Sequence, residues 1–380
     1  MRAVVWRGKS EIGVEQVDHP VIRRPTDAVV RVTASGLCGS DLHLYAGFIP
    51  GMKPGDVLGH EAVGVVAEVG SDIRSLAIGD RVVVPFNISC GTCFYCQRGL
   101  QSQCERTQNT RWHRGGSLFG YTHLYGGVPG AQAEYLRVPL ADHGPLRLPD
   151  EIDDDRAVLL ADVLPTAWQG VAYADVPPAS AVAVLGLGPI GQMSGRIAVL
   201  LGADRVIGVD KVPERLVMAE RNGIEALDLT KVDDLPEALV DLSGGRGADA
   251  VIDCVGLEAD GSLLDAILQR TKVQPSRAIA LRHAIDSVRR GGTISLLGVY
   301  GGWIHAFPID QLFDKQVTLR MGQANVRRWM DELVPLVADA TDRLGTGDLV
   351  THRPPLDDAP TAYGKFQKKE EGMVKVVFHP

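Results

Sequence analysis

The sequence predicts an α/β protein in which a β-rich part precedes a parallel sheet covered by helices on both faces. Up to about residue 140, short β-branched segments are bounded by Gly, Pro or Asp, which is typical of strands joined by turns. From about Ala181 on, apolar strands, glycine turns and long amphipathic runs alternate in the rhythm of βαβ units. The 43 glycines and 22 prolines also favour many tight turns over a helical bundle.

The elements can be assigned in chain order. In the first part the predicted strands are RAVVWRG, DAVVRVTASG, AVGVVAEVG, DRVVVPF and AEYLRVP. In the second part strands and helices are predicted from AVAVLGLG, IGQMSGRIAVLLGA, RVIGVD, PERLVMAERNG, ADAVIDCVG and TISLLGVY. Between Gly256 and Gly291 we expect a helix lengthened by an insertion, and from about Val317 mixed helix and strand that end in MVKVVFHP. Cys254, inside the apolar segment VIDCVG, is predicted to be a core residue.

Composition and charge exclude several classes of protein. A chain of 380 residues with 45% hydrophobic and 23% charged residues has the balance of a soluble globular protein of two or three domains. The net charge of -8 opposes binding to nucleic acid, which requires clustered Lys and Arg. The start MRAVVWRGKS lacks the apolar run of a signal peptide, and no stretch approaches the ~20 apolar residues of a membrane span. We therefore expect a cytoplasmic protein.

Four of the six cysteines lie in the segment CGTCFYCQRGLQSQC, residues 90–104. A disulfide knot, a zinc module for nucleic acid and a metal-stiffened lobe are the three interpretations of such a cluster. A reduced compartment and the size of the chain oppose the first, and the net charge opposes the second. Cys90, Cys93, Cys96 and Cys104 are therefore predicted to bind one closed, tetrahedral structural zinc. The alternative is a lobe whose metal is lost or replaced.

A dinucleotide-binding motif follows the first strand of the second part. Gly186, Gly188 and Gly191 have the spacing G-x-G-x-x-G, in which the first glycine turns the chain, the second admits a pyrophosphate and the third lets helix and strand pack closely. Pro189 and Ile190 belong to the same predicted cofactor-binding set. The alternative is a packed βα turn of an unrelated α/β protein.

The next strand, RVIGVD, ends in Asp210, where an acid is expected to accept hydrogen bonds from the adenosine ribose. A carboxylate there repels a 2′-phosphate, so NAD is favoured over NADP. Lys211 and Arg215 follow closely and are also predicted to contact the cofactor, which leaves some use of NADP possible.

Two glycine-flanked segments carry candidate metal ligands. SGLCGSDLH contains Cys38, Ser40, Asp41 and His43, and PGDVLGHEAVG contains His60 next to a glutamate. A thiolate, an imidazole and a carboxylate form a plausible catalytic zinc set with one position left for water or substrate. The spacing alone does not identify the third protein ligand.

These motifs together resemble the zinc-dependent alcohol dehydrogenases of the medium-chain dehydrogenase/reductase superfamily. GLCGSDLH, PGDVLGHEAVGVV, the four-cysteine run, GLGPIG and VD occur in the order found there, and the similarity covers essentially the whole chain. GAQAEYLRVPLAD, LADVLPTAWQG and THRPPLDDAPTAYGKF look most like the branch of glutathione-independent formaldehyde dehydrogenases.

The resemblance implies a discontinuous, GroES-like β-rich catalytic domain and a Rossmann-like coenzyme domain, with the active site in the cleft between them. The catalytic domain would comprise residues 1–163 and 318–380, with the structural-zinc lobe at 88–106, and the coenzyme domain residues 164–317.

The resemblance also implies the catalytic zinc ligands, which are Cys38, His60 and Asp162. Glu61 matches a glutamate that can approach the metal. Asp41 would orient the His60 ring by contacting the ring nitrogen that does not bind the metal. Taken singly, the three ligands could instead be a small buried thiol, a satisfied core histidine and a helix cap.

The remaining implied roles concern proton transfer and the cofactor. Ser40 would take the hydroxyl proton of the substrate and pass it through the nicotinamide ribose to His43, although a turn serine and a surface imidazole are the plain alternatives. Lys375 would contact the pyrophosphate, unless it is a solvated lysine on an edge strand. Val299, in the segment from Gly298 to Tyr300, is expected beside the nicotinamide at the carboxyl edge of the sheet.

The resulting prediction is a zinc-dependent oxidoreductase that transfers hydride between an alcohol, or a hydrated aldehyde, and NAD. An aldehyde dismutase with tightly bound NAD(H) and a non-catalytic binding protein on the same fold are the alternatives. The expected partners are a small alcohol or aldehyde and further copies of the chain in a homodimer or homotetramer, without nucleic acid or membrane. Candidate pocket walls, which could equally be core or interface aromatics, are Phe48, Trp112, Phe119 and Tyr121.

Overall fold

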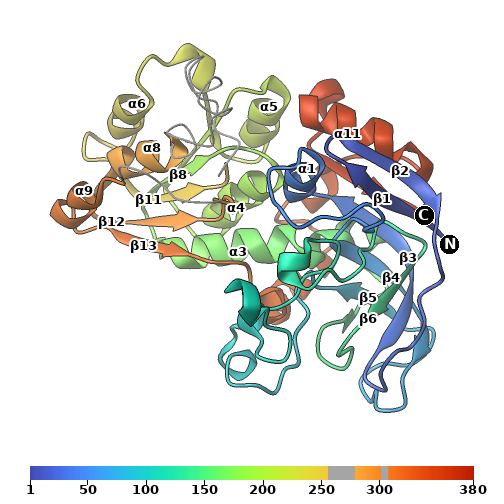
Figure 1. The fold of residues 1–380 in the computed structure, drawn as a ribbon. Coiled ribbons are helices and arrows are strands. Elements are labelled where there is room, and N and C mark those ends of the chain that lie inside the picture. Colours follow the sequence, from blue (N-terminus) through green and yellow to red (C-terminus); the bar gives the residue numbers. More distant parts are fainter. Residues whose placement is uncertain (256–278, 301–306) are drawn as a thin grey trace. The chain divides into compact units, whose positions relative to one another are not determined.

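The computed structural model describes residues 1–255, 279–300 and 307–380, which separate into two compact units (Figure 1). One unit comprises Met1–Pro165 and Ala324–Pro380, and the other comprises Thr166–Gln323. The sequence places the second border after residue 317. In the structure the strand β13 (Thr318–Met321) still belongs to the second unit, because it pairs in parallel with β12 (Val288–Leu296).

The first unit is built on an antiparallel β-sheet and a separate hairpin. Its strands are β1 (Arg2–Gly8), β2 (Glu11–Gln16), β3 (Ala28–Leu37), β4 (Glu61–Val69), β5 (Arg81–Val84), β6 (Tyr135–Val138), β7 (Leu146–Arg147), β14 (Val350–His352) and β15 (Lys375–Phe378). The sheet order is β14-β15-β3-β4-β5-β7, with β6 also paired to β3, while β1 and β2 form the hairpin. Only the β14–β15 pair in this sheet is parallel among the described residues. Alternating residues of these strands, such as Val30 and Val32, bury one face of the sheet in an apolar core.

The first unit also contains helices. They are α1 (Gly39–Tyr45), α2 (Asp154–Ala157), α10 (Met330–Ala338) and α11 (Ala359–Lys368), and α3 (Val163–Ala174) runs across the border between the units. A second core cluster joins α11 to α1 and to the ends of β3 and β15, through residues such as Leu37, Leu42, Tyr363 and Phe378. The C-terminal segment is thereby packed against α1.

The second unit contains a six-stranded parallel sheet in the order β10-β9-β8-β11-β12-β13. Its further strands are β8 (Ala181–Leu185), β9 (Arg205–Asp210), β10 (Glu225–Asp228) and β11 (Ala248–Asp253). Its helices are α4 (Pro189–Leu200), α5 (Pro213–Arg221), α6 (Leu235–Leu242), α8 (Ile279–Ser287) and α9 (Ile309–Asp314). Helices α6 and α8 pack on one face of the sheet beside Ile207, whereas Gly195 of α4 packs against the adjacent Val206. Helices therefore cover both faces, as predicted.

Two predictions for this unit need adjustment. The segment SLLDAILQR lies outside the described residues, and of the predicted long helix between Gly256 and Gly291 the structure describes α8. Cys254 follows β11 instead of lying inside it; it is half-buried, with its sulfur 3.8 Å from the hydroxyl oxygen of Ser194. Across the described ranges, no helix is both long and apolar enough to cross a membrane.

Candidate active site

The four-cysteine segment folds so that its sulfurs converge. The sulfur atoms of Cys90, Cys93, Cys96 and Cys104 all lie within 4.8 Å of one another, and all four cysteines are free thiols. Burial raises the pKa of Cys90, but hydrogen bonds from the backbone and hydroxyl of Thr92 outweigh it and lower that pKa to about 6. Four convergent sulfurs, one of them readily a thiolate, fit a closed zinc site that has no position open to substrate.

A second donor cluster begins at the start of α1. Leu37 ends β3, Cys38 is the N-cap of the helix, and Asp41 is its third helical residue. The backbone N–H of Cys38 donates to Asp41 Oδ2 at 3.0 Å, which is half of a capping box. Local helix geometry therefore fixes a candidate ligand and a fully buried carboxylate next to each other.

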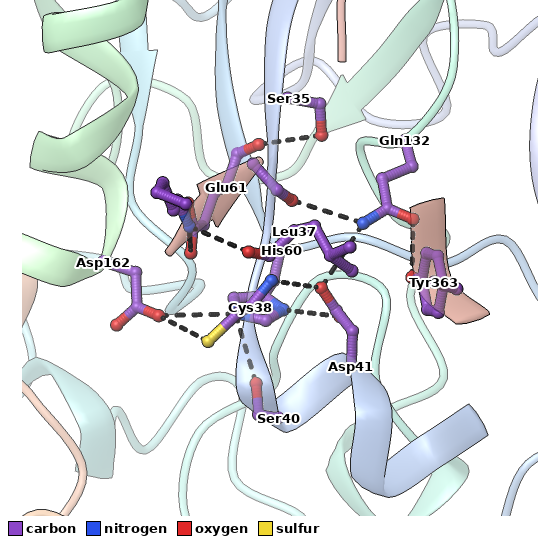
Figure 2. A network of polar contacts seen from close by, with 12 residues as sticks. Ser35, Leu37, Cys38, Ser40, Asp41, His60, Glu61, Gln132, Asp162 and Tyr363 are labelled. Carbon is purple, nitrogen blue, oxygen red and sulfur yellow. Dashed lines mark hydrogen bonds and ion pairs between the residues drawn. The ribbon is translucent and has the colours of Figure 1, made fainter. Parts of the chain in front are cut away.

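His60 directly precedes β4, and its side chain points toward Cys38 and Asp41 (Figure 2). Gly59 before it has a φ of +92°, and a Cβ there would lie 2.4 Å from Gln132 Cγ, so this turn requires glycine. The ring atom His60 Nδ1 lies 3.1 Å from Asp41 Oδ1. Although burial lowers it, the pKa of His60 is raised well above its ordinary value because the charge of Asp41 favours the protonated ring. Asp41 thus orients the ring and leaves Nε2 directed at the other donors.

Asp162 completes this cluster from a distant part of the chain. It lies between a short 3-10 helix, Val158–Ala161, and α3. Its Oδ2 lies 3.4 Å from Cys38 Sγ, whose thiol donates to it, and 3.4 Å from His60 Nε2 (Figure 2). Burial raises the pKa of the Cys38 thiol, and the Asp162 charge raises it further.

The spacing of these donors suits a metal ion. A tetrahedral zinc with bonds of about 2.0 to 2.3 Å holds its ligand atoms roughly 3.3 to 3.8 Å apart. The two distances of 3.4 Å fall in that range, and the donor types are those that zinc prefers. Cys38, His60 and Asp162 could therefore hold zinc as three protein ligands with a fourth position available.

Glu61, next to His60, belongs to the same cluster but is held by a buried lysine. Lys375 Nζ donates to Glu61 Oε1 at 2.6 Å and to the carbonyl oxygen of Leu37 at 3.1 Å, and both side chains of the pair are fully buried. Burial lowers the pKa of Lys375, but the Glu61 charge outweighs it, so that pKa is raised. Gly36 makes room for the pair, because a Cβ there would lie 1.9 Å from Glu61 Oε2.

This placement changes the interpretation of Lys375. Its strand β15 is paired on both sides, to β14 and β3, and all four of its residues are buried, so the alternative of a solvated lysine on an edge strand is wrong. The predicted contact with a pyrophosphate stays a prediction.

With zinc bound, one buried negative charge, that of Asp41, would remain at this site. The negative charges of a Cys38 thiolate and of Asp162 equal the charge of Zn²⁺, and Glu61 and Lys375 neutralise each other. Burial of an unbalanced charge would cost several kcal/mol or more. The ion pair therefore adds the Glu61 carboxylate beside the metal ligands without adding net charge, and hydrogen bonds stabilise the remaining charge of Asp41.

The other predicted side chains are placed as follows. Ser40 Oγ lies 3.4 Å from His60 Nε2, so its hydroxyl borders the donor cluster, and His43 is buried three residues further on α1. Phe119 is 2% exposed in the sheet core and is therefore not a pocket wall. Tyr121 is half-buried, while Phe48 and Trp112 are exposed.

Sequence reasoning missed two residues that support this cluster. Gln132 donates to Asp41 Oδ2 at 3.3 Å, and Tyr363 of α11 donates its phenolic hydrogen to Gln132 Oε1 at 2.7 Å (Figure 2). Both lie in motifs, GAQAEY and TAYGKF, that we used only for the resemblance. A glutamine inside a run of small and aromatic residues was the available signal, because buried amides need partners.

In the second unit, the glycine motif has the geometry expected of a pyrophosphate loop. Gly186 has a φ of +82°, and a Cβ on Gly191 would lie 1.8 Å from the carbonyl oxygen of Gly186. Gly188 is the N-cap of α4, Pro189 is its first residue, and Ile190 follows, all half-buried. The first turn of α4 therefore presents the backbone N–H groups of a helix N-terminus beside the glycine loop, which can bind a phosphate group.

The carboxylate of Asp210 lies at the carboxyl end of β9, beside this loop. It accepts hydrogen bonds from the backbone N–H groups of Leu187 at 2.7 Å and of Lys211 at 2.7 Å. Arg215 Nη1 lies 3.5 Å from Asp210 Oδ2. Val299, beyond the carboxyl end of β12, is 39% exposed. These residues therefore lie where the Rossmann fold binds a dinucleotide.

Comparisons with known proteins agree with both units. Residues 24–150 match the alcohol dehydrogenase GroES-like domain, and residues 189–274 match the zinc-binding dehydrogenase domain. The chain is 39% identical to the uncharacterized zinc-type alcohol dehydrogenase-like protein AdhB of Bacillus subtilis, with all of both chains covered. It is 32% identical to the glutathione-independent formaldehyde dehydrogenase of Pseudomonas aeruginosa, over 96% of this chain and 94% of that protein.

A solved structure agrees as well. Alcohol dehydrogenase TADH from Thermus sp. ATN1 superposes with a TM-score of 0.84 at 37% identity, over 100% of this chain and 99% of that one. The predicted GroES-like and Rossmann folds are thereby confirmed. AdhB and TADH are more similar to this chain than the formaldehyde dehydrogenase is, so membership of that branch stays a prediction. The chain belongs to the zinc-dependent alcohol dehydrogenases of the medium-chain dehydrogenase/reductase superfamily, and it is an oxidoreductase of that family.

Proposed function

We propose that this protein is an NAD-dependent zinc dehydrogenase that oxidises a small alcohol or a hydrated aldehyde, or reduces the corresponding carbonyl compound. The observation that carries the proposal is the buried cluster of Cys38, His60, Glu61 and Asp162. Three donors of different chemistry fit a catalytic zinc better than a structural one, because they leave a position for substrate. An intact ligand set also opposes the alternative of a non-catalytic binding protein.

Zinc held there would act as a Lewis acid on the substrate oxygen, and NAD would accept the hydride. The chain itself would orient the ligands and move the proton. Asp41 fixes the His60 ring, and the Ser40 hydroxyl, beside His60 Nε2, is placed to accept the proton of the substrate hydroxyl. His43 lies three residues further along the same helix, on the same face, and would receive the proton from this relay.

The test of this function combines metal analysis with a substrate screen. We expect two zinc ions per chain and reduction of NAD with at least one member of a panel of simple alcohols, polyols and hydrated formaldehyde. Turnover of aldehyde without added NAD, together with copurified NAD(H), would favour the dismutase instead. One zinc per chain and no turnover with any alcohol or aldehyde would refute the catalytic proposal.

The preference for NAD is proposed from Asp210, and it can be tested separately. Replacing Asp210 by Asn removes a charge that repels a 2′-phosphate, while Lys211 and Arg215 remain. We expect the ratio of kcat/KM for NADP to that for NAD to rise about 100-fold, since like charges brought together cost several kcal/mol.

The matched control is Asp204→Asn, an exposed aspartate just before the opposite end of β9. This variant should keep the parent ratio. Arg215→Met should lower the use of NADP, because it removes the nearest guanidinium. An unchanged ratio in Asp210→Asn would contradict the role of this carboxylate in cofactor choice.

We also propose a cytoplasmic location and a homodimer or homotetramer. The first is supported by six free cysteines, four of which gather in one metal-binding loop. Light scattering coupled to gel filtration would measure the assembly.

A further inference from the structure

A chain of buried polar side chains connects α11 to the candidate metal site (Figure 2). Tyr363 donates to Gln132 Oε1 at 2.7 Å, and Gln132 Nε2 donates to the carbonyl oxygen of Gly36 at 3.2 Å and to Asp41 Oδ2 at 3.3 Å. Tyr363, Gln132 and Asp41 are all 0% exposed. Water therefore cannot replace any of these hydrogen bonds, and each lost donor would leave a buried acceptor unsatisfied.

The hydrogen bonds from Tyr363 through Gln132 to Asp41 have only one possible donor–acceptor direction. The partners of Gln132 Nε2, a carbonyl oxygen and a carboxylate oxygen, are both acceptors. If the amide were turned over, its oxygen would face two acceptors, and its NH₂ group would face the tyrosine oxygen. The two acceptors therefore select the orientation in which Gln132 is a donor to Asp41, and the phenolic hydrogen of Tyr363 supports it by bonding to Oε1.

Asp41 transmits this orientation to two candidate ligands. The oxygen that Gln132 contacts, Oδ2, is also the acceptor for the backbone N–H of Cys38. The other oxygen, Oδ1, contacts His60 Nδ1. A carboxylate held on both oxygens cannot rotate, so it fixes the imidazole ring relative to the backbone that carries the Cys38 thiol.

We propose that Tyr363 and Gln132 are positioning residues of the catalytic metal site, acting through Asp41 on His60 and Cys38. This inference rests on the proposed zinc-dependent function. It assigns to the C-terminal helix α11 a part in metal binding, although that helix supplies no ligand. The competing explanation is that both residues only fill the core and satisfy the carbonyl group of Gly36.

The experiment compares the metal affinity and the cobalt spectrum of the parent protein and the variant Tyr363→Phe, each with both metal sites loaded. Removal of one hydroxyl should weaken metal binding at the site of Cys38, His60 and Asp162 about 10-fold, as for other partners of metal ligands. The d–d bands of Co²⁺ in that site should shift, because its ligands are held less firmly. Binding at the four-cysteine site should be unchanged, and this site is an internal control.

Tyr45→Phe is the matched control, because the ring of Tyr45 packs against that of Tyr363 with centroids 5.6 Å apart. The Tyr45 hydroxyl is not part of the hydrogen-bond network from Tyr363 to Asp41. This variant should leave both sites as in the parent. A double variant separates positioning from packing. In a Gln132→Met background, the change Tyr363→Phe should have no further effect on metal affinity, because the connection is already broken.

The outcomes distinguish this inference from the proposed function. A parent protein that binds only the four-cysteine metal would refute the proposed function, and this inference with it. A parent with two metals and a Tyr363→Phe variant with the parent's affinity and spectrum would overturn the inference alone. Loss of both metals in that variant, or additive losses in the double variant, would show a role in folding and would also overturn it.

Discussion

Replacing Cys38 by alanine is expected to remove one zinc ion per chain and to abolish most of the dehydrogenase activity. The thiol is one of three convergent donors, 3.4 Å from Asp162 Oδ2, and alanine offers no atom to the metal. Lewis-acid stabilisation is worth several kcal/mol, so we expect kcat/KM to fall about 1,000-fold or more. Zinc per chain and the initial rate of NAD reduction are the two measurements.

The matched control for this change is Cys254→Ala. Cys254 is a half-buried cysteine outside both clusters, so this variant should keep two zinc ions and the parent rate. The Cys38→Ala variant should still retain the zinc of the four-cysteine loop, which shows that the protein remains folded. Two zinc ions per chain in Cys38→Ala, with the parent rate, would contradict the assignment of Cys38 as a ligand.

Local sequence patterns were sufficient to predict most of the fold. The parallel sheet follows from alternating strands and amphipathic helices, and the glycine motif and Asp210 lie where this rhythm places them. The second domain border could not be found in this way. Whether 318–321 continues the sheet depends on pairing with β12, and strand pairing between distant segments leaves no pattern in a short window.

In the candidate site, too, contacts between neighbouring residues were predictable, whereas contacts between distant segments were not. Cys38 and Asp41 are three residues apart at a helix start, so their proximity follows from local geometry. Asp162 was expected only from the family resemblance, because nothing in the spacing connects it to His60. Gln132 and Tyr363 belong to separate segments that meet only in the folded core, and their contact could not be predicted.

Lys375 illustrates how burial changes the expected effect of a substitution. Its ammonium group and the carboxylate of Glu61 are both fully buried, 2.6 Å apart. Lys375→Met removes one charge and leaves the other in a site that cannot hydrate it. We expect a loss of about 3 to 5 kcal/mol in the free energy of unfolding, measured by urea denaturation with tryptophan fluorescence at saturating zinc.

Two further variants test whether the cause is the unpaired charge. In Lys365→Met the lost partner, Glu371, is on the surface, where water solvates it, so stability should hardly change. In the double variant Glu61→Gln/Lys375→Met no unpaired charge remains, and much of the lost stability should return. If the double variant were no more stable than Lys375→Met, an unpaired Glu61 carboxylate would not be the cause of the lost stability. The ion pair would then not be the reason that a lysine occupies this strand.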